Sequence, residues 1–213
     1  QEQLAVLDRV LRHNLRNDMN LVRGLAETIR SKTAGEVTDL AGEIIEASDQ
    51  LLELTEKERQ ITALLREDPS REEIEICDCL RQVAAEIASE YPDAAIAVNC
   101  PGAVTVRATP RLGQALEELV LNAIVHNDSS SPDVTVTVAQ QDETVRIDVA
   151  DTGPEIPEME QQLLVGEAKQ SPLYHGDGLG LWLVKLIVTR ASGSISVTEN
   201  SPVGNVVSIQ LPR

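Results

Sequence analysis

The chain contains no phenylalanine, one tryptophan and two tyrosines, and only four of its 18 basic residues are lysines. Acidic residues outnumber basic ones 35 to 18, which gives a formal net charge of −17. That excess of negative charge argues against sequence-independent binding to nucleic acid and against attachment to anionic membranes. An acidic surface poor in lysine and aromatics favours a halophilic protein, because salt screens the repulsion between surface carboxylates.

Cysteine and long apolar runs are also scarce. The three cysteines, Cys77, Cys79 and Cys100, lack a clustered fourth ligand for zinc, because the histidines are scattered along the chain. We therefore expect reduced, mostly buried thiols of a cytoplasmic protein. No apolar run approaches the length of a membrane span, and no signal peptide is visible. We expect a fragment that makes no membrane contact, with any sensor or membrane segment outside it.

Apolar residues recur at helical spacing in residues 2–31 and again in 36–66, on either side of a turn at Lys32–Gly35. This pattern predicts an antiparallel helical hairpin. The two apolar stripes consist of Leu4, Leu7, Leu11, Leu15, Val22, Leu25 and Ile29, and of Val37, Leu40, Ile44, Ala47, Leu51, Leu54, Ile61 and Leu65. Because one hairpin leaves much of such a stripe uncovered, the sequence predicts a homodimer that forms a four-helix bundle.

Asp68-Pro69-Ser70 interrupts the helical pattern, so we expect one domain over residues 1–67 and another over 68–213. Short strands and helices alternate in the second domain. This mixture predicts an α+β chain whose second domain is an α/β sandwich with helices on one face of the sheet. The strands are expected at 73–76, 94–98, 104–107, 134–139, 144–150, 194–198 and 205–211, and the helices at 78–90, 110–127 (with Thr109 as N-cap), 158–165 and 179–191.

Gly176-Asp177-Gly178-Leu179-Gly180-Leu181 precedes the apolar part of the last predicted helix. Glycines allow a ligand to approach the backbone, and a helix N-terminus offers free N–H groups that suit phosphate. The stretch is not a P-loop, because no Gly-Lys-Ser/Thr ends it. The alternative is a tight loop that caps a buried helix.

Two further short segments contain residues that could contact a ligand. Glu118, Asn122 and His126 are spaced four apart and would share one helix face, although a solvated polar stripe would look the same. The Asn122 amide lies among apolar residues and needs a partner, and its oxygen suits Mg²⁺. Asp151-Thr152-Gly153 follows a predicted strand, so its carboxylate could accept a hydrogen bond from an exocyclic base amine; the alternative is an Asp-initiated turn.

His13 lies about half a turn away from the apolar stripe of the first helix, so it is not a core histidine. An isolated surface histidine is usually only an exposed polar residue. An exposed imidazole on a rigid helix is, however, also a nucleophile.

The order of these segments along the chain resembles that of a known protein family. The segment from Glu118 through Asn122 to His126-Asn127 resembles the N box of the GHKL superfamily, and Asp151-Thr152-Gly153 and Gly176–Leu181 resemble its two glycine boxes. His13-Asn14-Leu15-Arg16-Asn17 resembles the H box of histidine kinases. The resemblance covers nearly the whole chain, which looks like a sensor histidine kinase catalytic core of the haloarchaeal type. It implies a Bergerat-type ATPase fold for the second domain.

For nucleotide binding, the resemblance implies ATP and Mg²⁺ as cofactors. Asn122 would be the metal ligand, with Glu118 supporting it or positioning water. Asp151 would read the adenine amine, and Gly153 would allow the base to approach. The remaining nucleotide-binding positions implied by the resemblance are His126, Gly176, Gly178, Leu179, Gly180 and Leu181.

For phosphotransfer, the resemblance implies that His13 attacks the γ-phosphate and passes the phosphoryl group to an aspartate on a response-regulator receiver domain. Asn17 matches the position linked to dephosphorylation of the regulator. Asn14 stands where an acidic residue usually follows the histidine, Val125 where relatives often carry lysine, and Pro154-Glu155 where glycine usually follows the first box. These departures leave two alternatives, a degenerate module that binds ATP or only dimerises and docks, and a GHKL ATPase or serine kinase.

Overall fold

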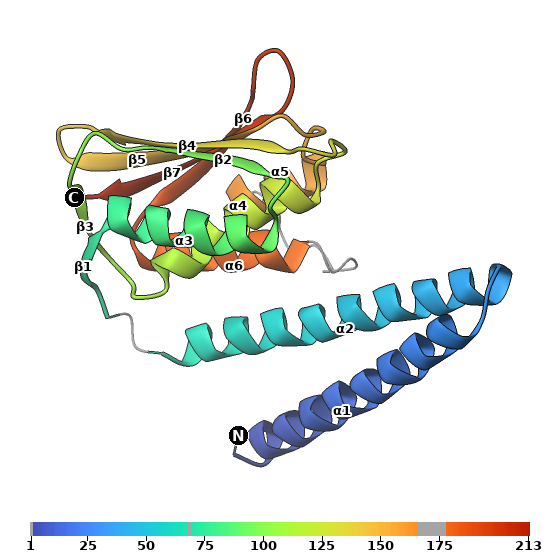
Figure 1. Cartoon of the computed structure of the whole chain (residues 1–213). Coiled ribbons are helices and arrows are strands. Elements are labelled where there is room, and N and C mark those ends of the chain that lie inside the picture. The colour runs from blue at the N-terminus through green and yellow to red at the C-terminus, as the bar shows by residue number, and fades with distance from the viewer. Residues whose placement is uncertain (1, 68–69, 166–177) are drawn as a thin grey trace. The chain divides into compact units, whose positions relative to one another are not determined.

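The computed structural model describes residues 2–67, 70–165 and 178–213, with side chains from His13 onward (Figure 1). These residues divide into two compact units. The first consists mainly of residues up to Ala63, and the second mainly of residues from Leu64 to the C-terminus. We call them the hairpin unit and the sheet unit and describe each separately.

The hairpin unit is built from two antiparallel helices, α1 (Glu2–Lys32) and α2 (Glu36–Arg66), as the sequence predicts. Gly35 closes the turn between them with φ of 67°, a left-handed conformation that glycine adopts readily. Its carbonyl accepts a hydrogen bond from the Thr38 N–H at 2.8 Å, which starts α2. Two ion pairs cross between the helices, from Arg16 to Glu56 at 2.6 Å and from Arg23 to Asp49 at 2.9 Å. Both pairs fix the antiparallel register.

Mostly small side chains occupy the buried positions of the hairpin near its turn. Ala26, Ala41 and Ser48 are buried there together with Ile45, so the helices can approach closely. Many of the larger apolar side chains of the hairpin are instead exposed, namely Leu15, Leu21, Val22, Leu25, Ile29, Val37, Leu40, Ile44 and Leu51. Most of them belong to the two predicted stripes, so a single copy of the hairpin leaves these stripes in water.

The sheet unit contains a five-stranded mixed sheet. In spatial order its strands are β2 (Ala95–Asn99), β4 (Asp133–Gln140), β5 (Thr144–Asp151), β7 (Asn205–Pro212) and β6 (Ser194–Glu199). The β2–β4 pair is parallel and the other three pairs are antiparallel. A separate antiparallel ribbon pairs β1 (Glu72–Glu75) with β3 (Thr105–Ala108). All seven predicted strands are confirmed, and no end moves by more than one residue.

Helices cover one face of this sheet. Figure 1 shows α3 (Ile76–Glu90), α4 (Leu112–Val125) and α6 (Gly178–Arg190) on the same side, and α5 (Glu158–Val165) follows β5 in the chain. The side chains along β4 and β5 alternate, so that Val136 and Ile147 are buried while their neighbours are more exposed. The buried valines, isoleucines and leucines of the strands and helices form the core of this unit. The predicted α+β class and the one-sided sandwich are confirmed.

The start of α4 differs from the prediction. Thr109 is not the N-cap, because the helix begins at Leu112 and Arg111 occupies the cap position without a side-chain cap bond. The Leu112 N–H donates to the Thr109 carbonyl at 2.9 Å, so a separate turn precedes the helix. Arg111 is used elsewhere: its guanidinium pairs with both carboxylate oxygens of Glu67, the residue after α2, and lowers the pKa of Glu67. A long-range ion pair has therefore replaced the local cap.

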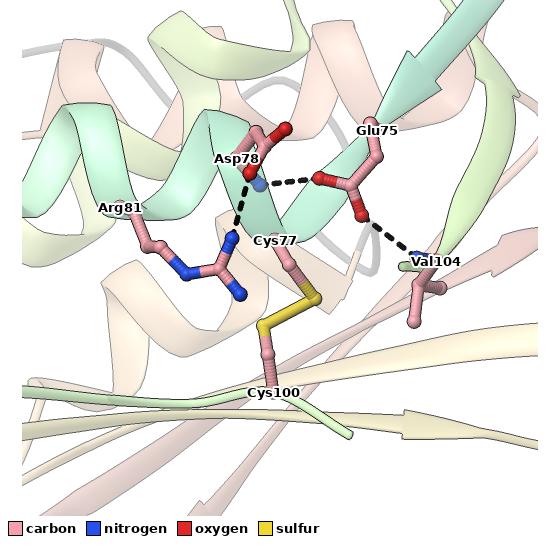
Figure 2. The surroundings of a disulfide bond; sticks show 6 residues. All are labelled: Glu75, Cys77, Asp78, Arg81, Cys100 and Val104. Atoms are coloured by element: carbon pink, nitrogen blue, oxygen red, sulfur yellow. Dashed lines mark hydrogen bonds and ion pairs between the residues drawn. A yellow bond between two sulfur atoms is a disulfide. The ribbon is translucent and has the colours of Figure 1, made fainter. Parts of the chain in front are cut away.

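The prediction that all three cysteines are reduced is wrong. Cys77 and Cys100 form a disulfide, with Cα atoms 5.9 Å apart, and only Cys79 is a free thiol (Figure 2). Cys77 lies in the first turn of α3 and Cys100 directly follows β2. The two residues are separated by 23 positions, so their contact depends on how α3 packs against β2 and leaves no local sequence signal.

Glu75 holds the same corner together through hydrogen bonds. Its carboxylate accepts from the backbone N–H of Asp78, which caps α3, and from the Val104 N–H at 2.7 Å (Figure 2). The Val104 bond and then the backbone bonds at the helix start lower the pKa of Glu75. The N-terminus of α3 is therefore tied to both neighbouring segments.

Candidate functional site

Asp151 is a buried carboxylate at the end of β5, with 6% of its surface exposed. Its Oδ1 accepts a hydrogen bond from the Gly153 N–H at 2.8 Å, which folds the chain back just after the strand. This local bond is the Asp-initiated turn that the sequence allows. The turn is compatible with ligand binding, because the second carboxylate oxygen, Oδ2, does not take part in it.

At Gly153, just after β5, the chain lies close to Asn127, just after α4. A Cβ at Gly153 would lie 3.3 Å from Asp151 Oδ1 and 3.4 Å from Asn127 Nδ2. A side chain here would therefore crowd both polar groups. Since α4 ends at Val125, Asn127 is placed just beyond the helix that carries Asn122. The structure thus brings the first predicted glycine segment and the end of the Asn122 helix into one corner.

Two buried amides in this region have no protein partner. The Nδ2 atoms of Asn122 and Asn127 are both inaccessible, and neither makes a hydrogen bond within the part of the chain that the structure describes. The Asn127 Oδ1 accepts from the Ser129 N–H at 2.9 Å, which orients its amide. A buried donor without a partner costs about 1–3 kcal/mol. Two such donors, one on α4 and one just after it, indicate a site that a ligand or water completes.

Glu118 and His126 lie on either side of Asn122 along the chain. Glu118 is half-buried on α4, one turn before Asn122. His126 is exposed and is the C-cap of α4, where its backbone N–H donates to the Asn122 carbonyl at 3.1 Å. The helix ends at Val125, two residues before the predicted end. Neighbouring Glu117 has a raised pKa, mainly from desolvation and then from the carboxylates of Glu86, Glu118 and Glu90.

The structure describes only part of the second predicted glycine segment, Gly176–Leu181. Gly178 begins α6, and Leu179, Gly180 and Leu181 complete its first turn. The N–H groups of a first helical turn have no partners within the helix, and they carry the positive end of the helix dipole. The turn is thus chemically suited to an anion such as phosphate. Gly176 lies outside the described residues.

His13 is exposed on α1 of the hairpin unit, as predicted. The Asn17 amide nitrogen lies 3.3 Å from His13 Nδ1, one helical turn away. If the amide donates, the neutral ring carries its proton on Nε2. An amide turned over, with its oxygen toward Nδ1–H, would instead leave the lone pair on Nε2. Asn17 is therefore placed to select the tautomer of His13.

No group of three or more His, Cys, Asp or Glu side chains gathers as a metal site in residues 13–67, 70–165 and 178–213. A site with one amide oxygen from Asn122 is nevertheless compatible with Mg²⁺, because this ion keeps several waters and takes other ligands from phosphates. A single amide oxygen from Asn122 therefore fits an ion that is bound mainly through a nucleotide. It does not fit a cage built by protein side chains.

Comparison with known proteins decides the family. Residues 108–213 match the family described as "Histidine kinase-, DNA gyrase B-, and HSP90-like ATPase". The matched range contains Asn122, Asp151, Gly153 and the first turn of α6. The chain is a histidine kinase catalytic core. Its ATPase domain is of the GHKL type.

Relatives of this kinase core are sensor kinases. The chain is 37% identical over 101 residues to sensor protein kinase CarS of Pseudomonas aeruginosa, covering 46% of this chain and 22% of CarS. It is 30% identical over 91 residues to sensor histidine kinase CitA of Klebsiella pneumoniae, covering 43% and 17%. The chain thus spans about a fifth of the length of these curated relatives. Among the described helices, none is long and apolar enough to cross a bilayer.

Solved structures extend the likeness to the hairpin. The crystal structure of full-length ShkA in complex with AMPPNP matches 99% of this chain and 45% of its own, with TM-score 0.67 and 26% identity. Acinetobacter baumannii histidine kinase AdeS matches 94% of this chain and 97% of its own, with TM-score 0.62, and at 18% identity it supports the fold alone. Both likenesses include the helical hairpin as well as the ATPase domain, because they cover nearly the whole chain.

Two residues of the Asp151 corner have no role predicted from the sequence. Asn127 ends the N-box segment, and only its contact with Gly153 reveals its position beside Asp151. Asn205 opens β7, and its side chain donates to Asp151 Oδ1 at 3.1 Å. A signal for Asn205 existed, because a buried amide at the start of an apolar strand needs a partner.

Proposed function

We propose that this chain is the catalytic core of a two-component sensor kinase that transfers the γ-phosphoryl group of ATP to His13. Residues 1–67 form its dimerisation and phosphotransfer domain, and residues 68–213 its ATP-binding domain. The phosphoryl group then passes to an aspartate of a response-regulator receiver domain. The observation that carries this proposal is the Asp151 corner in a GHKL-type domain, preceded in the same chain by an exposed histidine on a helical hairpin.

At the base, Asp151 accepts a hydrogen bond from the exocyclic amine of adenine. The lack of a side chain at Gly153 supports this role, because a Cβ there would crowd Asp151 Oδ1. At the phosphates, the first turn of α6 supplies N–H donors. Together they fix the two ends of the nucleotide, and positioning is the main requirement of phosphoryl transfer.

Asn122 would hold the metal ion through its amide oxygen, and Glu118, one turn earlier on α4, would support it or position water. When bound, Mg²⁺ neutralises charge that develops on the phosphate oxygens. The buried Nδ2 of Asn122 has no hydrogen-bond partner among the described residues, so it favours an acceptor such as a phosphate oxygen or water close to this amide.

At the acceptor, His13 uses the Nε2 lone pair to attack the γ-phosphorus, and the bond from that phosphorus to the β-phosphate bridging oxygen breaks to release ADP. This lone pair belongs to the tautomer with its proton on Nδ1. The Asn17 amide would stabilise that tautomer when turned so that its oxygen, in place of the nitrogen 3.3 Å away, faces Nδ1. Asn17 thereby supplies the orientation that an acidic residue at position 14 would otherwise give. The same amide positions the water that dephosphorylates the regulator.

The hairpin supports a homodimer. Its large exposed apolar side chains form stripes that a second hairpin would bury in a four-helix bundle.

The acidic composition further supports a halophilic protein, for which lowering the salt concentration should lower the melting temperature.

The test is incubation with γ-labelled ATP and Mg²⁺. We expect an acid-labile, base-stable label on the wild type and none on His13→Ala, whereas Asn20→Ala on the same helix keeps the label. Label that persists in His13→Ala would contradict the proposal and would favour a serine kinase. Asn14, which lacks a carboxylate beside His13, favours one alternative, a module that binds ATP without transferring phosphate. ADP binding without any label would support that module.

A further inference from the structure

Asn205, the first residue of β7, makes several side-chain hydrogen bonds to Asp151 and to the segment that follows it. It is buried, with 4% of its surface exposed. Its Nδ2 donates to Asp151 Oδ1 at 3.1 Å and to the Pro154 carbonyl at 2.8 Å, and its Oδ1 accepts from the Ile156 N–H at 3.0 Å. One side chain thus joins the carboxylate to the segment that follows it.

The sheet register places Asn205 there. Strands β5 and β7 are antiparallel with Ala150 opposite Val206, so the next pair outward is Asp151 and Asn205. The β6–β7 loop closes against the same residue, because the Asn200 amide donates to the Asp151 carbonyl at 2.7 Å. Gly204 has φ of 115°, and a Cβ there would lie only 1.9 Å from that carbonyl oxygen. The backbone at Asp151 and Asn205 is therefore held closely.

The bonds to Asp151 are unequal at its two oxygens. Oδ1 accepts from Gly153 N–H at 2.8 Å, from Asn205 Nδ2 at 3.1 Å and from Asn205 N–H at 3.3 Å. Oδ2 receives one long contact, 3.4 Å from Asn205 Nδ2, among the hydrogen bonds of the described residues. Because Oδ1 is engaged, the carboxylate plane is fixed and Oδ2 keeps most of its acceptor capacity.

We propose that Asn205 is a positioning residue for base selection: it fixes the Asp151 carboxylate so that Oδ2 faces the exocyclic amine, and it holds Pro154–Ile156 in register with the occupied base site. This inference rests on the proposed function, since it takes Asp151 as the group that reads the base. A base with a carbonyl at that position presents an acceptor to Oδ2 and is rejected. Without the Asn205 side chain only the backbone N–H groups of Gly153 and Asn205 hold Oδ1, so the carboxylate is less firmly fixed and the distinction between the two bases weakens.

The experiment compares ADP with inosine diphosphate, which carries a carbonyl in place of the amine, by calorimetric titration of the full chain with Mg²⁺. In Asn205→Ala we expect ADP affinity to fall about 10- to 100-fold while inosine diphosphate affinity changes little, so the preference for ADP falls at least about tenfold. The matched control is Asn99→Ala at the exposed end of β2, which keeps both affinities. If Asn205 had only a structural role, its loss would lower the affinities for ADP and inosine diphosphate equally and leave the preference for ADP unchanged.

A second variant guards against misfolding of Asn205→Ala. Asn205→Ser keeps a donor but is too short to reach Asp151 and Pro154 together, so the preference should fall by a smaller factor. Amide hydrogen exchange at Ile156 should accelerate in both variants, because its acceptor is lost. An unchanged ADP preference in a folded variant would overturn the inference, whereas a wild type that binds no ADP would overturn the proposed function itself.

Discussion

In the sheet unit, Ile147, Leu183 and Ile209 are completely buried, whereas in the hairpin unit Leu21 and Leu25 leave 63% and 57% of their surface exposed. Both units are rich in aliphatic side chains, so the difference is one of geometry. A sheet covered by helices encloses its core within one chain. Two helices have only one interface between them, and small residues such as Ala26 and Ala41 already fill it.

The polar interactions differ in the same direction. The hairpin is joined by exposed ion pairs such as Arg23–Asp49, which are worth little individually. The sheet unit adds a disulfide and buried hydrogen bonds around Asp151 to an extensive core. We therefore expect the sheet unit to be stable by itself and the hairpin to depend on a second copy.

The largest expected effect comes from charging the exposed stripe of the hairpin. Leu25→Glu should raise the dissociation constant of the dimer at least about 100-fold, because a symmetric interface loses two leucines worth about 1.5–3 kcal/mol each. Sedimentation equilibrium measures the change. Gln50→Glu adds the same charge at an exposed polar position and should leave the dimer intact. Equal dimerisation of both variants would show that this stripe is not the interface.

Removing the disulfide should act on the sheet unit alone. Cys77→Ala combined with Cys100→Ala should lower the free energy of unfolding by about 3 kcal/mol, from the chain entropy of a loop of this length. Trp182 on α6 is the single tryptophan, so its fluorescence during urea unfolding reports the sheet unit. Cys79→Ala, which removes the free thiol, is the control and should cost clearly less. A double variant as stable as the control would mean that the bridge contributes little.

The smallest expected effect is a pH dependence of the hairpin. Hydrogen bonding to Arg59 and then to Arg16 lowers the pKa of Glu56 to about 2. Because the folded pKa is depressed, this pair contributes fully above the ordinary pKa of 4.5 and is lost as pH falls toward 2. For this partly exposed pair we expect about 0.5–1 kcal/mol.

Circular dichroism during acid titration measures this contribution as loss of helix. Glu56→Gln should remove the part of the transition between pH 4.5 and 2 that belongs to this group. Glu53→Gln, which breaks only the pair with Lys57 inside α2, is the matched control. The same acid titration curve for wild type and Glu56→Gln would show that the pair does not stabilise the hairpin.

Much of the fold could be predicted because its signals are local. The two hairpin helices follow from apolar residues at helical spacing, and β4 and β5 follow from strict alternation. The errors at the start and the end of α4 concern element ends, where long-range contacts compete with local capping. Arg111, for instance, lies at the cap position of α4, but its side chain bonds to Glu67 and Gln114 and makes no cap bond.

The sequence by itself determined the element types, the exposed His13 and the order of the segments at Asn122, Asp151 and the α6 glycines. Each of these signals lies in a short run of neighbouring residues, so it can be read without a fold. Only the tertiary structure decided the Cys77–Cys100 bridge and the pairing of Asn205 with Asp151, 54 positions away. The register of β5 with β7 sets that second contact, and register is a property of the assembled sheet.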